Sequence, residues 1–258
     1  MNIQPGPILT IARYTSMEAL RTRYAWLVLV LVAAGLAIGA FTGSLAITET
    51  SQTQAVITAS ILRIAAVLLL ILFVTTSIHR DFSDKSVELM LSLPLPRAGY
   101  FLGKLLGYML VAAGTAAALS ILLMMFAPVD ASLMWGLSLL LELTLVCALS
   151  LLFAFAFSQV TASISATVLF YLLGRSIAAI QLMAHGPLAN QAQTSTKVMT
   201  VFVDGLAYLL PNLDEFSRST WLIYPSTAAE LSPVVAQTLI YVMLLSGIAM
   251  FDLYRKNF

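Results

Sequence analysis

The chain has 258 residues, of which 60% are hydrophobic and only 10% are charged, and its formal net charge is +1. A soluble globule of this size could not keep so much apolar surface from water. The near-neutral charge also argues against nucleic-acid binding, which needs a clustered basic face. We therefore expect an integral membrane protein.

Six apolar stretches reach the length of about 20 residues that a helix needs to cross the hydrocarbon core. Uninterrupted stretches of this kind favour helices over barrel strands, because a helix satisfies its own backbone amides in lipid. The sequence predicts an all-α polytopic membrane protein whose single membrane domain fills residues 1–258. The predicted spans are 26–46, 56–78, 105–127, 133–155, 162–183 and 235–251.

Residues 8–24 before the first span have the pattern of an amphipathic helix lying in the membrane interface. One face collects the apolar and small residues Ile8, Ile11, Ala12, Thr15, Ala19 and Leu20. Arg13, Glu18 and Arg21 fall largely elsewhere. An ordinary extension of the first span is the alternative.

Gly35, Gly39 and Gly43 recur at intervals of four in the first span. Such small-residue ridges let two helix backbones approach closely. The partner helix can belong to the same chain or lie across a dimer seam.

Three charged residues lie inside predicted spans, namely Arg63, Glu142 and Arg175. An isolated charge at mid-membrane costs about 2.5 to 3.5 kcal/mol on insertion scales, so these side chains should seek partners. Their depths permit an intramembrane cluster. The cluster could gate transport or contact substrate, or it could be a structural ion pair with Arg63 snorkelling outward.

The densest run of charge lies in residues 79–104, between the second and third spans. It contains a short predicted helix that Ser83 or Asp84 could cap and that Pro94 and Pro96 end. We expect His79 to lie in a solvated loop or at the membrane interface, and the pair Asp81 and Asp84 to be solvated. The result is a stiff lever joined to a span at each end.

The cations fall mainly on one side of the membrane when loops are assigned alternately. That side receives Arg13, Arg21, Arg23, Arg80, Lys85, Arg97, Lys104, Arg255 and Lys256, whereas the other receives Lys197 and Arg218. The positive-inside rule makes the first side cytoplasmic and places both termini there. We expect location in the inner (plasma) membrane of a bacterium.

The longest outer segment, residues 185–233, precedes the last span. Its apolar piece, 198–210, is too short to cross the membrane and is interrupted by Asp204 and Gly205. This pattern predicts a re-entrant or interfacial helix.

No pattern in the sequence supports catalysis, a cofactor or a metal site. A phosphate-loop near miss at Gly103 and Lys104 fails because Ala98 replaces the first glycine and Leu105 replaces the magnesium-binding hydroxyl. The histidines, His79 and His185, fall on opposite faces, and Cys147 is the only cysteine. We expect a protein that is not itself an enzyme.

The segment SVELMLSLPLPRAGYFLGKLLG resembles the inner-loop signature of type-2 ABC transporter permeases. The matching features are Glu88, the leucine-rich run, Pro94, Arg97 and the Gly103-Lys104 pair. The overall layout and, less specifically, the PNLDEF run at 211–216 are also similar to that family. Lys85-Ser86 stands where the family usually has a Gly-Thr pair.

This resemblance implies a permease subunit that works with a separate ABC ATPase, for export or for passing force across the membrane. The permeases would form a homodimer or heterodimer in membrane lipid, with room for a periplasmic or additional membrane partner. The inner-loop helix would dock in the ATPase; the alternative is a solvated face. The contact set that the resemblance implies is Asp84, Lys85, Glu88, Leu91, Pro94 and Arg97.

Two rival functions remain open on the sequence. An ion-driven secondary transporter would use the Arg63, Glu142 and Arg175 network. An intramembrane enzyme would need catalytic side chains clustered at one depth, and the sequence offers none.

Overall fold

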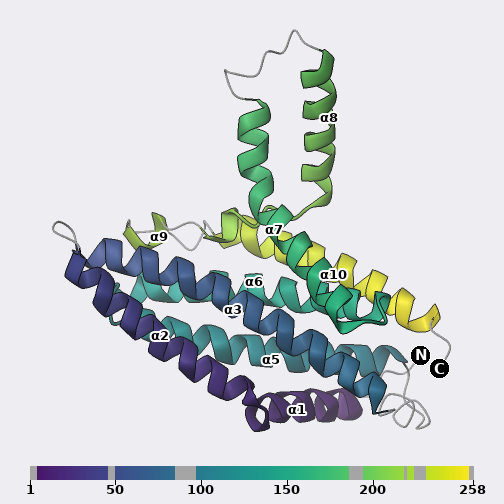
Figure 1. Cartoon of the computed structure of the whole chain (residues 1–258). Coiled ribbons are helices and arrows are strands. Elements are labelled where there is room, and N and C mark those ends of the chain that lie inside the picture. Colours follow the sequence, from purple (N-terminus) through teal and green to yellow (C-terminus); the bar gives the residue numbers. More distant parts are fainter. Residues whose placement is uncertain are drawn as a thin grey trace.

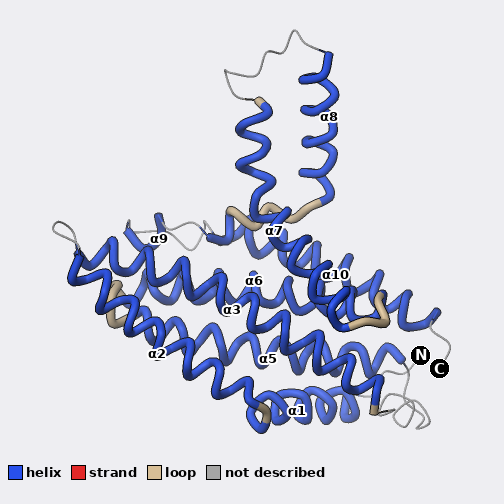
Figure 2. Tube along the Cα trace, viewed as in Figure 1, coloured by secondary structure: helices blue, strands red, loops and turns tan. Residues whose placement is uncertain are grey.

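The computed structural model describes residues 5–45, 50–84, 97–185, 194–217, 220–223 and 231–255, and within these ranges every regular element is a helix. The elements form an elongated bundle with both termini at one end (Figures 1 and 2). We call this the termini end and the opposite one the far end. The elements are α1 Pro5–Arg21, α2 Arg23–Leu45, α3 Thr50–Ser83, α5 Arg97–Leu123, α6 Val129–Ala156, α7 Val160–Ala184, α8 Thr194–Leu209, the 3-10 helix η1 Glu215–Ser217, α9 Thr220–Ile223 and α10 Ser232–Arg255.

Six of the described helices, α2, α3, α5, α6, α7 and α10, are long and apolar enough to span a membrane. Each overlaps one of the predicted spans. The prediction of an all-α polytopic membrane protein is confirmed.

Helix α6 forms the centre of the bundle and packs against α3, α5, α7 and α10. Its sequence is apolar around most of the circumference, as expected for a helix that is buried over most of its surface, although Leu133 and Leu137 remain about half exposed. Leu139, Leu143 and Val146 are among its fully buried residues. By contrast, α2 lies at the periphery, where Trp26, Leu29 and Phe41 are exposed on the surface of the bundle.

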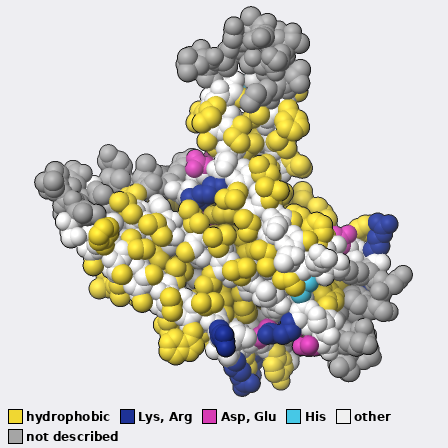
Figure 3. Space-filling model, viewed as in Figure 1, with side chains coloured by type: hydrophobic (Ala, Val, Ile, Leu, Met, Phe, Trp, Pro, Cys, Tyr) yellow, Lys and Arg dark blue, Asp and Glu magenta, His cyan; other side chains and the backbone are white. Residues whose placement is uncertain are grey.

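The described part of the chain is predominantly hydrophobic on the surface seen in Figure 3. Several charged side chains gather at the lower edge that carries α1, and others lie near the end of α10 and beside the foot of the α7 and α8 pair. A hydrophobic belt with charges beyond it fits a bundle that crosses a bilayer.

Helix α1 is a helix as predicted, and it packs along the first half of α5. Ile11, Ala12, Thr15 and Ala19 form its buried face. Two details of the prediction are wrong: Leu20 is exposed, and Glu18 turns toward the bundle to pair with α3 and α5. For Glu18, pairing with cations on neighbouring helices outweighs the tendency of charged residues to lie on the exposed face of α1.

Glycines allow the close approach of α1 to α5. A Cβ atom on Gly103 would lie 2.8 Å from Ile11 Cβ and 3.1 Å from Ile8 O. One on Gly107 would lie 3.0 Å from Ala12 O and closer still to Thr15. Both positions therefore require a residue without a side chain.

The three glycines of α2 make contacts within the chain. Gly35 faces Leu62 of α3 and Leu122 of α5, and Gly39 faces Phe126. Gly43 faces Gln54 near the start of α3. This ridge is thus occupied by intrachain packing.

The inner loop predicted over residues 79–104 is longer than the connection in the structure. Helix α3 continues to Ser83 and α5 begins at Arg97, so only residues 84–96 separate them. The charges at 79–81 do not end α3, because they find partners on α1, α5 and α7. The predicted short helix lies largely outside the described residues.

The outer segment includes the helix predicted over its apolar piece. Helix α8 runs beside the last part of α7, and this helical pair stands away from the rest of the bundle (Figure 1). The chain then returns through residues 210–217 onto α6 and α7.

We expect Gly107→Leu to lower the midpoint of thermal unfolding in detergent, because the new side chain would push α1 away from α5. Overpacking of this kind costs about 1 to 3 kcal/mol. Gly114→Leu on the same helix is the matched control, since a Cβ there meets nothing within 4 Å. Equal losses in the two variants would contradict the close packing of α1.

Candidate functional site

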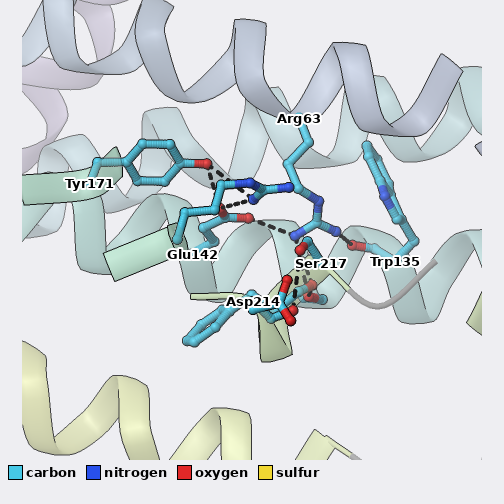
Figure 4. A network of polar contacts seen from close by, with 9 residues as sticks. Arg63, Trp135, Glu142, Tyr171, Asp214 and Ser217 are labelled. Atoms are coloured by element: carbon cyan, nitrogen blue, oxygen red, sulfur yellow. Dashed lines mark hydrogen bonds and ion pairs between the residues drawn. The ribbon is translucent and has the colours of Figure 1, made fainter. Parts of the chain in front are cut away.

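The structure brings Arg63, Glu142 and Arg175 together in the middle of the bundle, from α3, α6 and α7 (Figure 4). Arg63 Nη1 lies 2.6 Å from Glu142 Oε2, and both side chains are almost completely buried. Arg175 Nη1 lies 3.4 Å from Glu142 Oε1, and its side chain is 23% exposed. Arg63 is therefore an internal cation that does not snorkel outward.

Tyr171, which the sequence did not single out, completes the coordination of the carboxylate. Its hydroxyl donates to Glu142 Oε1 at 2.8 Å and accepts a bond from Arg175 Nη1 at 3.3 Å. Tyr171 precedes Arg175 by four residues, so the two side chains share one face of α7. This spacing was the available signal.

The same network holds the outer segment at Phe216. Arg63 Nη1 donates to Phe216 O at 2.9 Å, and the Ser138 hydroxyl donates to the same oxygen. Arg63 also lies against Trp135, with Cζ 5.1 Å from the ring centroid. We call Arg63, Trp135, Ser138, Glu142, Tyr171, Arg175 and the Phe216 carbonyl the mid-bundle network.

A second contact holds the outer segment against α7 beside Arg175. Leu213 N donates to Gly174 O at 3.2 Å, and a Cβ on Gly174 would lie 3.0 Å from Pro211 O. Gly174 therefore lets residues 211–216 pack directly against α7.

In the mid-bundle network, the buried charged groups of Arg63 and Glu142 are bonded to other groups of the protein. Both oxygens of Glu142 are engaged by strong donors, and Arg63 spreads its donors over Glu142, Ser138, Phe216 and Trp135. A buried ion pair with its remaining groups hydrogen-bonded is stable only while both partners are present. This geometry favours the structural interpretation of the trio.

A second polar cluster lies at the termini end and was not predicted. Lys104 of α5 is 5% exposed, and its Nζ lies 2.6 Å from Asp81 Oδ2 of α3 and 3.7 Å from Glu18 Oε2 of α1. One ammonium group thus connects three helices. We call this cluster the termini-end network.

Further bonds extend the termini-end network. Glu18 Oε1 accepts a bond from Ser77 Oγ at 2.8 Å and pairs with Arg80. Tyr108 OH donates to Ser77 at 2.9 Å, and Tyr100 OH donates to Asp81 at 3.1 Å. The full set is Glu18, Ser77, Arg80, Asp81, Tyr100, Lys104 and Tyr108.

Two expectations about solvated residues are wrong at this end. His79 is 7% exposed, and its ring nitrogens lie 3.0 Å from Thr75 O and 3.4 Å from Ser163 Oγ. Asp81 is paired with Lys104, and only Asp84 is exposed as expected. Both departures arise because α3 extends to Ser83 and stays packed against α5 and α7.

Of the six residues expected to contact an ATPase, Asp84 and Arg97 are described, and Lys85, Glu88, Leu91 and Pro94 lie outside the described residues. Asp84 is exposed at the end of α3. Arg97 Nη1 donates to Leu253 O at 3.2 Å and to Tyr254 O at 3.0 Å, in the last turn of α10. Arg97 therefore has a structural role at the start of α5.

The described residues contain no group of three or more His, Cys, Asp or Glu placed to hold a metal ion. The chain matches no protein-family model and no curated protein.

We expect Glu142→Gln to destabilise the protein by about 3 to 5 kcal/mol, because Arg63 would keep a buried charge without a counter-ion. The measurement is the unfolding midpoint in detergent. The double variant Arg63→Gln with Glu142→Gln should recover part of the loss. Additive losses in the double variant would show that the two charges do not depend on each other.

We expect Lys104→Met to loosen α1, because Glu18 and Asp81 would lose their shared cation. Amide hydrogen exchange in α1 should rise, while exchange in α6 stays unchanged. Arg21→Met, an exposed position at the end of α1, is the control. Unchanged exchange in α1 would contradict the role assigned to Lys104.

Proposed function

We propose that the chain is the membrane-spanning permease subunit of an ABC transporter, driven by a separate ATPase and used for export or for force transmission across the membrane. The sequence carries the inner-loop resemblance but no complete nucleotide-binding motif of its own. ATP hydrolysis would therefore belong to a partner.

The orientation in this proposal follows from the cations. Arg23 lines a groove together with Arg80, and Arg80 and Lys104 both pair with Glu18 of α1, the helix that also carries Arg13 and Arg21. The positive-inside rule makes the termini end cytoplasmic, where ATP is available.

One observation supports the proposal most directly. The helices on either side of the inner loop, α3 and α5, are joined to each other and to α1 by the Lys104 ion pairs. A force on residues 84–96 would consequently move α1, α3 and α5 together. A loop used as a lever needs such a rigid base.

The Gly-Lys pair of the resemblance acquires a physical explanation in this arrangement. Gly103 lets α1 approach α5, and Lys104 supplies the cation that holds α1 and α3. Both residues serve the base of the lever, so they need not contact the ATPase.

The ion-driven alternative has less support. A carboxylate that carries a coupling ion must exchange partners with water, whereas Glu142 is fully buried and its two oxygens are bonded to Arg63 and Tyr171. The mid-bundle network fits an anchor for the outer segment.

The test is affinity purification of the tagged chain from membranes of its native host. We expect a companion protein that contains a phosphate-loop motif, together with ATP hydrolysis in the purified complex. The charge-reversal variant Asp84→Lys with Glu88→Lys should lose both the companion protein and the ATP hydrolysis, because the loop would lose its acidic contacts.

The control is Asp130→Lys, which reverses the charge of an exposed residue at the far end. This variant should still purify with the companion protein. Arg97 is unsuitable for this test, since its loss would also release the end of α10. Full ATP hydrolysis in the Asp84→Lys and Glu88→Lys variant, or transport by the purified chain alone, would contradict the proposal.

A further inference from the structure

A groove of about 650 Å³ runs between α2 and α3 on the outside of the bundle. Its walls are mainly apolar and include Leu27, Leu68, Leu69 and Leu72. Toward the termini end the lining changes to Thr22, Arg23, Thr76, Ser77 and Arg80. The groove thus has an apolar body and a cationic end.

The dimensions of the groove match one leaflet of a bilayer. Its α3 lining runs from Ala65 to Arg80, a rise of about 22 Å at 1.5 Å per residue. Half of the hydrocarbon core is about 15 Å thick, so the apolar body covers a leaflet and the arginines reach the headgroup region. Trp26, which is 71% exposed and lies close to Arg23 on α2, suits the same interfacial depth.

The charges at the cationic end are not fully used by the protein. Within the described ranges Arg23 is exposed and has no ion-pair partner. Arg80 pairs with Glu18, but its side chain remains 50% exposed and Glu18 is shared with Lys104. Arg23 thus carries a charge without a counter-ion, and Arg80 remains half exposed beside a carboxylate that Lys104 also contacts.

A neighbouring groove shows that this charge is a specific feature. The groove of about 400 Å³ between α1, α2 and α5 lies on the other side of Tyr24 and is lined by residues such as Leu29, Leu110 and Val111. Its lining includes no charged side chain. Lipid chains could fill either groove, but only the α2 and α3 groove adds cations for a headgroup.

We propose that the α2 and α3 groove is a binding site for a glycerophospholipid with a net negative headgroup. The acyl chain lies along Leu68, Leu69 and Leu72, and the phosphate accepts bonds from Arg23 and Arg80. Guanidinium groups bind phosphate oxygens in a bidentate fashion. A zwitterionic lipid presents the same phosphate with a cation attached, which the two arginines disfavour.

The test uses the full chain, purified in detergent and stripped of lipid, in titrations followed by native mass spectrometry. The probes are phosphatidylglycerol and phosphatidylcholine with identical acyl chains. We expect one phosphatidylglycerol molecule to bind about 25-fold more tightly, because each of the two arginines contributes the factor of about five usual for a basic residue near an anionic surface. Arg23→Gln should weaken phosphatidylglycerol binding about fivefold and leave phosphatidylcholine unchanged.

Two further variants separate this site from general attraction to lipid. Arg13→Gln removes an exposed cation that does not line the groove, and it should leave both affinities unchanged. Ala65→Trp fills the apolar body and should weaken both lipids. Equal affinity for the two lipids, an equal loss in Arg13→Gln, or unchanged binding in Ala65→Trp would each overturn the proposal.

Discussion

The burial of Glu142 is the constraint on which the centre of the bundle depends. A carboxylate removed from water inside a membrane protein must keep a cation and fill its remaining acceptor positions. Glu142 meets this requirement with Arg63 from α3 and with Tyr171 and Arg175 from α7. One side chain on α6 thereby fixes the positions of two neighbouring helices and, through Arg63, of the Phe216 carbonyl.

The same principle operates at the termini end with a single ammonium group at its centre. Lys104 joins α1, α3 and α5, and the glycines at 103 and 107 bring α1 close enough for Glu18 to take part. Helix α3 contributes Arg63 to the mid-bundle network and Ser77 to the termini-end network. These two residues lie about 21 Å apart along the helix axis. The helix therefore connects the inner loop to the site where Arg63 binds the outer segment at Phe216.

The sequence predicts the spans well because hydropathy alone decides which helices enter lipid. It also predicts that Arg63, Glu142 and Arg175 seek partners, since an isolated charge is costly there. It does not predict the roles of Glu18 and Lys104, which depend on how closely α1 packs against α5. The spacing of Gly99, Gly103 and Gly107 at intervals of four is the sequence signal for that packing.

Arg80 connects the proposed lipid site to the proposed lever. It lines the α2 and α3 groove, and it also pairs with Glu18 in the termini-end network. A lipid phosphate and the Glu18 carboxylate would thus compete for donors on one guanidinium group. Coupling between two binding events is reciprocal, so a rearrangement of α1 that frees Arg80 would strengthen lipid binding, and bound lipid would favour that rearrangement. The surrounding membrane would then influence how firmly the base of the lever is held.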